Sequence, residues 1–150
     1  MLMKNKLISD LKKNISASNV LDTLEERYAY AQDAANIRRI KNLPDAVVFV
    51  ENTEQVQKVV KLANKYKVPV ICRGAGTNVV GACLVEHGGI ILNFSRMNKI
   101  LSISKENMTA CVEPGVVLGC LQKEVEKLGL FYPPDPSNLA VSTIGGSIAQ

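Results

Sequence analysis

Residues 69–81 have the sequence Pro69-Val-Ile-Cys-Arg-Gly-Ala-Gly-Thr-Asn-Val-Val-Gly81, an apolar run followed at once by a glycine-rich turn. Three glycines and no bulky side chain before Val79 allow the backbone amides of this turn to converge on one place, which makes a nest suited to phosphate oxygens. The spacing differs from the dinucleotide fingerprint and from the P-loop, and Leu84–Gly89 leads into a further strand where those motifs open a helix. Glycine is also the usual residue of tight structural turns, so the loop alone leaves both interpretations open.

The residues before this loop predict a strand, a helix and a second strand. Ala46–Val50 is an apolar, β-branched run typical of a strand covered on both faces. Asn52 can cap a helix that runs to about Tyr66, and Gln55 can reach back to it in a capping box. Val68–Cys72 follows as the second strand, which completes a unit with the size of a right-handed parallel crossover. We therefore expect an α/β fold.

The residues after the loop predict a hairpin and a further helix. Lys105-Glu-Asn107 is a turn-forming cluster, so the apolar runs beside it are expected to pair as antiparallel strands. Gly129 stands where a left-handed residue would close the helix that follows the hairpin. The expected elements are strands at 89–94, 100–104 and 108–113 and a helix through Val117, Leu118, Leu121, Val125 and Leu128.

The first 35 residues show the apolar spacing of helices. One stripe is formed by Leu7, Ile8 and Leu11, and another by Val20, Leu21, Leu24, Tyr28 and Ala31. We therefore predict two N-terminal helices in residues 1–35, ahead of a larger unit over residues 36–150.

Composition and charge exclude several classes of protein. The chain has 150 residues, of which 47% are hydrophobic, enough for one domain or for part of a larger one. The net charge of +4 is spread along the chain and aromatic residues make up 5%, so nothing favours nucleic-acid binding. We find no signal peptide and no apolar run near the roughly 20 residues of a transmembrane segment, and we expect a cytoplasmic protein.

The cysteines and the histidine offer no catalytic or metal-binding pattern. Cys72, Cys83, Cys111 and Cys120 form no C-x-x-C pair, so we expect them to be reduced and mostly buried. His87, the only histidine, precedes two glycines and is expected in a solvated turn.

A second candidate anion site follows the last predicted helix. The prolines of Phe131–Ser137 require a stiff extended loop, in which Asp135 is expected to bind neighbouring amides. Ser142-Thr-Ile-Gly-Gly146 then resembles a helix start, whose free amides would favour an anion. Together with the glycine-rich loop it predicts a diphosphate held between the two. Because this helix start has no stop signal before Gln150, we expect a truncated domain.

These motifs resemble the N-terminal FAD-binding region of the FAD-linked oxidases, especially the D-lactate dehydrogenase and glycolate oxidase flavoprotein subunit group. The resemblance rests on the order and separation of Pro69–Thr77, Val112–Val116, Pro134–Ser137 and Ser142–Gly146, and on Tyr30 and Asp33 upstream. It implies the vanillyl-alcohol-oxidase-type (PCMH-type) fold, with the first subdomain and the start of the second present.

The resemblance also implies which residues bind the cofactor. Relatives with covalently bound flavin have a histidine where this chain has Thr77, so non-covalent FAD is implied. Ser147 and Val50 depart modestly from the family pattern. The implied FAD-binding residues are Arg73, Gly74, Ala75, Gly76, Thr77, Asn78, Gly81, Pro134, Asp135, Ser142, Thr143, Gly145 and Gly146.

The function implied is the FAD-binding portion of a dehydrogenase or oxidase of a 2-hydroxy acid of the D-lactate or glycolate type. The cap domain and the C-terminal catalytic segments of that family are not in this sequence, so no catalytic or metal-binding residue is assigned and the chain alone is expected to be inactive. Two alternatives stay open: a non-catalytic fragment or split subunit that a homo-oligomer or partner chain completes, and a cell-wall nucleotide-sugar reductase of the same fold.

Overall fold

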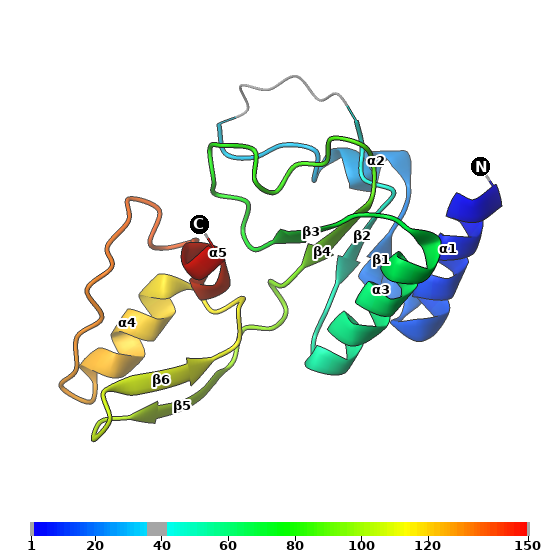
Figure 1. The fold of residues 1–150 in the computed structure, drawn as a ribbon. Coiled ribbons are helices and arrows are strands. Elements are labelled where there is room, and N and C mark those ends of the chain that lie inside the picture. The colour runs from blue at the N-terminus through cyan, green and yellow to red at the C-terminus, as the bar shows by residue number, and fades with distance from the viewer. Residues whose placement is uncertain (1, 36–41, 150) are drawn as a thin grey trace.

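The computed structural model describes residues 2–35 and 42–149, which form two lobes (Figure 1). The first lobe has a four-stranded sheet with helices against it, and the second has a two-stranded hairpin with helices beside it. The first lobe consists of α1 (Leu2–Asn14), a 3-10 helix (Ala17–Asn19), β1 (Val20–Leu21), α2 (Leu24–Tyr28), β2 (Ala46–Phe49), α3 (Thr53–Tyr66), β3 (Val70–Arg73) and β4 (Ile90–Asn93). The second lobe consists of β5 (Ile100–Ser104), β6 (Thr109–Val112), α4 (Leu118–Glu126) and α5 (Ile144–Ala149).

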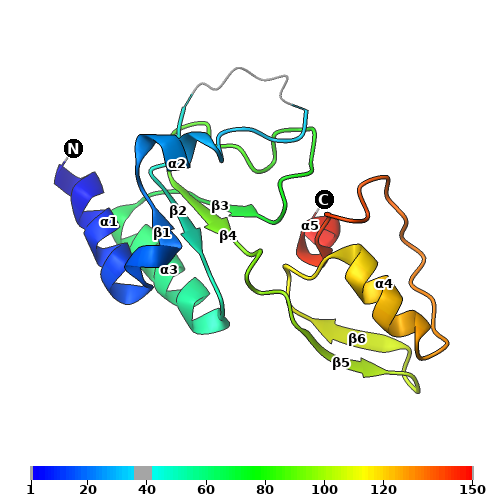
Figure 2. The same cartoon turned by 180° about the vertical axis from the view of Figure 1, so that it is seen from behind.

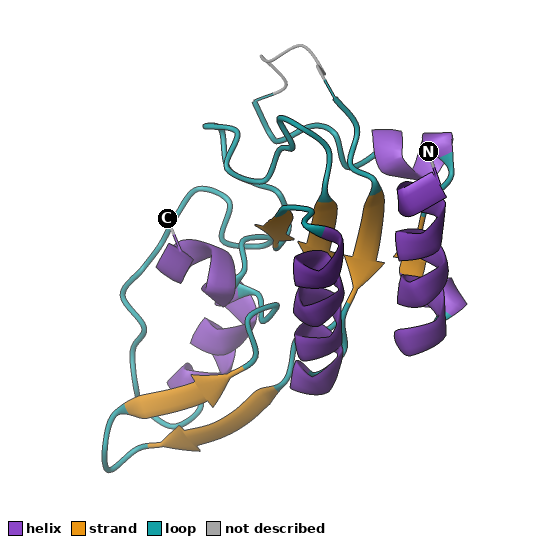
Figure 3. Cartoon of the chain, turned by 45° about the vertical axis from the view of Figure 1, so that its right-hand side comes forward, coloured by secondary structure: helices purple, strands orange, loops and turns teal. Residues whose placement is uncertain are grey.

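The four-stranded sheet has the order β1-β2-β4-β3, and β4 pairs in parallel with both β2 and β3. Its side chains alternate between two cores. Val48 and Leu92 pack beneath α1 and α3, which cover one face (Figure 3), whereas Val47 and Ile91 pack with Val85 on the other. Burial on both faces is why β2 and β4 are near-continuous apolar runs.

The predicted strand-helix-strand unit is confirmed with one addition. Asn52 caps α3 by accepting a hydrogen bond from the Gln55 N–H at 2.9 Å. The Gln55 side chain accepts from the N–H of Glu51 at 2.8 Å, so its return bond is shifted by one residue from the predicted capping box. β4 lies between β2 and β3, so the two strands joined by α3 are not neighbours.

The N-terminal prediction is right for α1 and right only in part for the second helix, which is confined to α2 (Leu24–Tyr28). Val20 and Leu21 form β1, which pairs antiparallel with Val48 and Val47 of β2. The free edge of β2 offers these residues backbone partners, and this pairing prevails over their helix-type spacing. The remaining helix, α2, is short and begins at a full capping box between Thr23 and Glu26.

The second lobe follows its predicted elements. β5 and β6 form an antiparallel hairpin, and Gly129 has a φ of 71° just after α4. The core of the lobe is formed by Val116, Leu118, Leu121, Val125 and Ile144. The described part of α5 ends at Ala149, and Gln150 lies outside the described residues.

The cysteines are free, but the expectation that most are buried is wrong. Only Cys83 is buried, whereas Cys72, Cys111 and Cys120 are exposed. Cys111 lies on a two-stranded hairpin whose β6 is largely exposed, and Cys120 lies off the buried stripe of α4. A small lobe leaves such positions uncovered.

Candidate functional site

A cleft of about 1000 Å³ lies between the two lobes, and both predicted anion-binding segments contribute to it. The end of β3 and the glycine-rich loop contribute to its lining from the first lobe, and the proline-rich loop and α5 contribute from the second. Figure 2 shows α5 of the second lobe beside the end of β3 of the first. Every predicted FAD-binding residue except Gly81 lines this cleft: Arg73, Gly74, Ala75, Gly76, Thr77, Asn78, Pro134, Asp135, Ser142, Thr143, Gly145 and Gly146.

The glycine-rich loop presents unpaired backbone amides to the cleft. Among the described residues, the N–H groups of Ala75, Gly76, Thr77 and Asn78 have no hydrogen-bond partner. Gly76 has a φ of 76°, and an added Cβ would lie 2.6 Å from Cζ of Arg73, so this close approach requires glycine. Adjacent free amides in a glycine turn form a nest for phosphate oxygens, and the loop therefore fits a diphosphate.

Gly81 occupies a different position from the rest of the predicted set. Its φ is 82° and its N–H donates to Oδ2 of Asp33 at 2.9 Å, away from the cleft lining. Gly81 therefore closes the loop rather than facing the cleft.

Two amides at the start of α5, those of Ile144 and Gly145, are not free as the sequence suggests. The N–H of Ile144 donates to Val116 O and that of Gly145 to Pro114 O, both at 2.8 Å. A bridge between Val117 and Thr143 holds the start of α5 against the segment that enters α4, and this contact uses the amides. This side of the cleft thus offers mainly hydroxyls and close packing to a ligand.

The two sides of the cleft touch at one end. The hydroxyls of Thr77 and Ser142 form a hydrogen bond of 3.2 Å, and Gly74 packs directly against the side chain of Thr143. Ser142 and Thr143 are both buried, so this contact joins the lobes through small polar residues.

Charge in the cleft is sparse, since Arg73 and Asp135 are the only charged residues that line it within the described part of the chain. The Asp135 side chain is exposed and forms no hydrogen bond with the described residues, so the expectation that it orders its loop is wrong. Gln122 of α4 has that role instead, because its Nε2 donates to Tyr132 O at 3.2 Å and to Pro134 O at 2.9 Å. Nothing in the sequence of the proline-rich loop indicates that Gln122 orders it.

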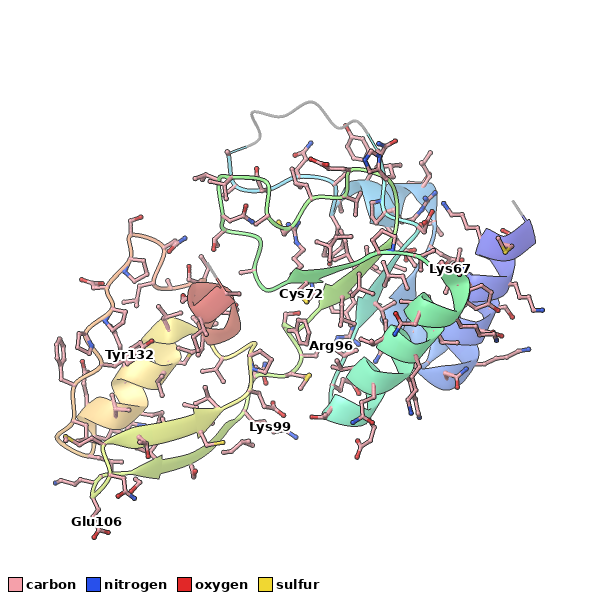
Figure 4. The ribbon with its side chains drawn as sticks, viewed as in Figure 1. Lys67, Cys72, Arg96, Lys99, Glu106 and Tyr132 are labelled. Atoms are coloured by element: carbon pink, nitrogen blue, oxygen red, sulfur yellow. The ribbon has the colours of Figure 1, made fainter. Side chains whose placement is uncertain are left out.

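The remaining chemical groups play no part in the cleft or only line it. Cys72, labelled in Figure 4, lines the cleft, and partial burial raises the pKa of its thiol, which keeps it protonated at neutral pH. His87 is exposed in a turn outside the cleft, as predicted.

Residues 2–35 and 42–149 contain no group of three or more metal-ligating side chains. No helix in the described ranges is long and apolar enough to span a bilayer.

Known proteins are similar to this chain in sequence and in fold. Residues 44–150 match the family described as FAD binding domain. The chain is 42% identical over 132 residues to the glycolate oxidase subunit GlcD of Bacillus subtilis, covering 88% of this chain and 28% of the relative. It is 36% identical over 143 residues to the mitochondrial D-lactate dehydrogenase [cytochrome] of Arabidopsis thaliana, covering 95% of this chain and 25% of the relative.

Solved structures agree with the sequence relatives. An alkyldihydroxyacetonephosphate synthase superposes with a TM-score of 0.83 at 31% identity, covering 97% of this chain and 31% of that one. A p-cresol methylhydroxylase with substrate bound gives a TM-score of 0.76 at 30% identity, covering 87% of this chain and 26% of that one. These matches confirm the expected vanillyl-alcohol-oxidase-type fold.

The chain therefore belongs to the FAD binding domain family of the FAD-linked oxidoreductases, and its cofactor is FAD. It spans between about a quarter and a third of the length of the relatives described above.

Proposed function

We propose that this chain is the FAD-binding part of a flavin-dependent dehydrogenase or oxidase that acts on a 2-hydroxy acid of the D-lactate or glycolate type. The observation that carries the proposal is the row of unpaired amides from Ala75 to Asn78, which lines a cleft between two lobes. The choice of substrate class rests on the named activities of the glycolate oxidase and D-lactate dehydrogenase relatives.

In this proposal the amides of Ala75–Asn78 bind the diphosphate of FAD, and Arg73 adds a positive charge behind the loop. Thr77 offers a hydroxyl where a covalent link would need a nucleophilic ring nitrogen, so the cofactor is held non-covalently. When bound, the flavin supplies the acceptor for a hydride leaving the α-carbon of the substrate.

The 150-residue chain by itself is expected to bind FAD without oxidising substrate. A base for the substrate hydroxyl would have to lie in the cleft, where the titratable side chains among the described residues are those of Arg73, Asp135, Cys72 and Cys83. None of these is a histidine, the side chain that most often serves as a catalytic base. Measurable oxidation of D-lactate or glycolate by the purified chain with added FAD would contradict this part of the proposal.

Titration of FAD against the purified chain, followed by quenching of flavin fluorescence, tests the cofactor site. Gly76→Ala is expected to weaken FAD binding by about tenfold or more, since the new methyl group would displace the loop from its left-handed conformation. Gly129→Ala is the matched control, because Gly129 has a similar φ of 71° but lies outside the cleft. Equal affinity of the Gly76 variant and the unaltered chain would refute the assignment of the loop.

A second candidate function is a subunit whose flavin site is completed by another chain. Three large apolar side chains of the second lobe support it: Phe131, Ile148 and Leu101 are 75%, 79% and 59% exposed. Exposed apolar groups of this kind often mark an interface. Analytical ultracentrifugation with and without FAD tests it, and a monomer that binds FAD tightly on its own would argue against a partner.

A further inference from the structure

We propose that the segment Tyr30–Ala34 belongs to the cofactor-binding machinery, because it holds the glycine-rich loop in its amide-presenting conformation, with Arg73 as the positioning residue that joins the two. The segment lies before residues 44–150, the part of the chain that matches the FAD binding domain family. The inference rests on the proposed function, and it concerns the loop that would bind the diphosphate.

The Arg73 side chain connects the start of the loop to this upstream segment. Its Nη1 donates to Gln32 O at 2.9 Å and to Tyr30 O at 3.4 Å, and its guanidinium lies 5.5 Å from the centre of the Tyr30 ring. The same nitrogen lies 3.2 Å from Sγ of the buried Cys83, which also accepts from Nδ2 of Asn78 at 3.0 Å. The guanidinium is therefore used for contacts within the protein.

The upstream segment also bonds to the far end of the loop. The Ala34 N–H donates to Asn78 O at 3.1 Å, and the carboxylate of Asp33 accepts from the Gly81 N–H at 2.9 Å. The loop is thus tied at its start through Arg73 and at its end through Asn78 and Gly81. The residues between these ties are the ones whose amides are unpaired.

This arrangement has a physical reason. Neighbouring N–H dipoles that point to one place repel each other, and a free glycine-rich loop would turn them toward water. Ties at both ends keep the amides converged before the ligand arrives, which lowers the ordering cost of binding. Gly76 rests against the guanidinium, so the planar fork of Arg73 also shapes the loop. A lysine at position 73 would keep the charge and lose the fork.

The test compares Arg73→Lys with Arg96→Lys. Arg96 is a matched control, because it donates to Asn19 at 2.6 Å and lies 4.7 Å from the Phe49 ring centre, yet lies outside the cleft. The full chain is titrated with FAD and with ADP, which shares the diphosphate. Arg73→Lys is expected to weaken both ligands about tenfold and in parallel, the loss of one charge-assisted hydrogen bond, while Arg96→Lys leaves both unchanged.

Hydrogen exchange of the Ala34 and Gly81 amides in ligand-free protein supplies an independent measurement, since both amides donate hydrogen bonds that connect the upstream segment to the loop. Exchange at both is expected to accelerate in Arg73→Lys and to be unaltered in Arg96→Lys. If Arg73→Lys does not fold, Asp33→Asn takes its place, with the same direction expected at Gly81 and for both ligands.

The outcomes separate the two proposals. Unaltered affinity for FAD and ADP in Arg73→Lys, or affinity lost only in proportion to a lower Tm, would overturn the positioning role alone. An unaltered chain that binds neither FAD nor ADP would overturn the proposed function, and the positioning role with it.

Discussion

Replacing Gly74 by alanine would place a methyl group against Thr143 at the point where the lobes touch. The added Cβ would lie closer than 3.0 Å to Oγ1 of Thr143, whereas Cβ and Cγ2 of Thr143 would be 3.4 and 3.5 Å away. The hydroxyl is therefore the one overlapping atom. Thr143 is 5% exposed and its backbone is bridged to Val117, so it has little freedom to withdraw.

The expected loss of stability in Gly74→Ala follows from two opposing effects. Overpacking costs about 1–3 kcal/mol, and a less flexible unfolded chain offsets about 0.4–1 kcal/mol, so Gly74→Ala is expected to lower the free energy of unfolding by about 1–2 kcal/mol. Thr143→Ala is expected to lower it by about 1 kcal/mol, because its hydroxyl accepts from the Gly146 N–H at the start of α5. In the double variant the methyl group meets no atom closer than 3.4 Å.

A double-mutant cycle measures the contact directly. Urea unfolding followed by circular dichroism, on the unaltered chain, both single variants and the double variant, is expected to give a coupling free energy of about 1–2 kcal/mol. The double variant should be about as stable as Thr143→Ala. Losses that add to within about 0.5 kcal/mol would refute the contact between the lobes.

Three further predictions concern other positions. Gly145→Ala is expected to lower the free energy of unfolding by about 1–3 kcal/mol, although alanine favours helices. The reason is that the added Cβ would lie 2.6 Å from Cβ and 2.9 Å from O of Pro114. A Tm at or above that of the unaltered chain would contradict this prediction. Lys67→Gly is expected to raise the free energy of unfolding by about 1 kcal/mol, since Lys67 (Figure 4) ends α3 with a φ of 53°, and an unchanged urea midpoint would count against this. The hydrogen bond from the Tyr66 hydroxyl, at 2.7 Å, holds the pKa of the Asp10 carboxyl below its ordinary value of 3.8. This bond stabilises the fold above about pH 3.8, and the stabilisation is lost as the pH falls through the lower folded-state pKa. Asp10→Asn should therefore show a smaller fall in urea midpoint between about pH 5 and pH 3 than the unaltered chain. An equal fall in both proteins would contradict this prediction.

Local signals in the sequence predict much of the fold. The apolar run of β2, the cap at Asn52, the turn at Lys105–Asn107 and the left-handed Gly129 act over a few residues, and each lies where it was expected. Pairing partners are different, because they depend on residues far apart in the chain. Nothing local in Val20–Leu21 reveals the free edge of β2, and nothing in β4 reveals that it enters between two earlier strands.

The same difference between local signals and long-range contacts applies to the candidate site. Glycine spacing predicts the loop of Gly74–Asn78, because backbone freedom is a property of the residues themselves. The amides of Ile144 and Gly145 at the start of α5 donate to Val116 O and Pro114 O, contacts between segments that the spacing of Ser142–Gly146 cannot show. The direction of the Arg73 side chain is likewise set by Tyr30 and Gln32, whose carbonyl oxygens carry no signal in the sequence.

The central place of β4 in the sheet has a consequence for how the protein is made. Ribosomes synthesise β2, α3 and β3 first, yet these parallel strands pair with β4 and not with each other. The nascent chain must therefore keep two apolar strands apart, with α3 bridging them, until residues 90–93 emerge. Insertion of that middle strand also anchors the chain on both sides of the glycine-rich loop, because the loop runs from the end of β3 toward the start of β4.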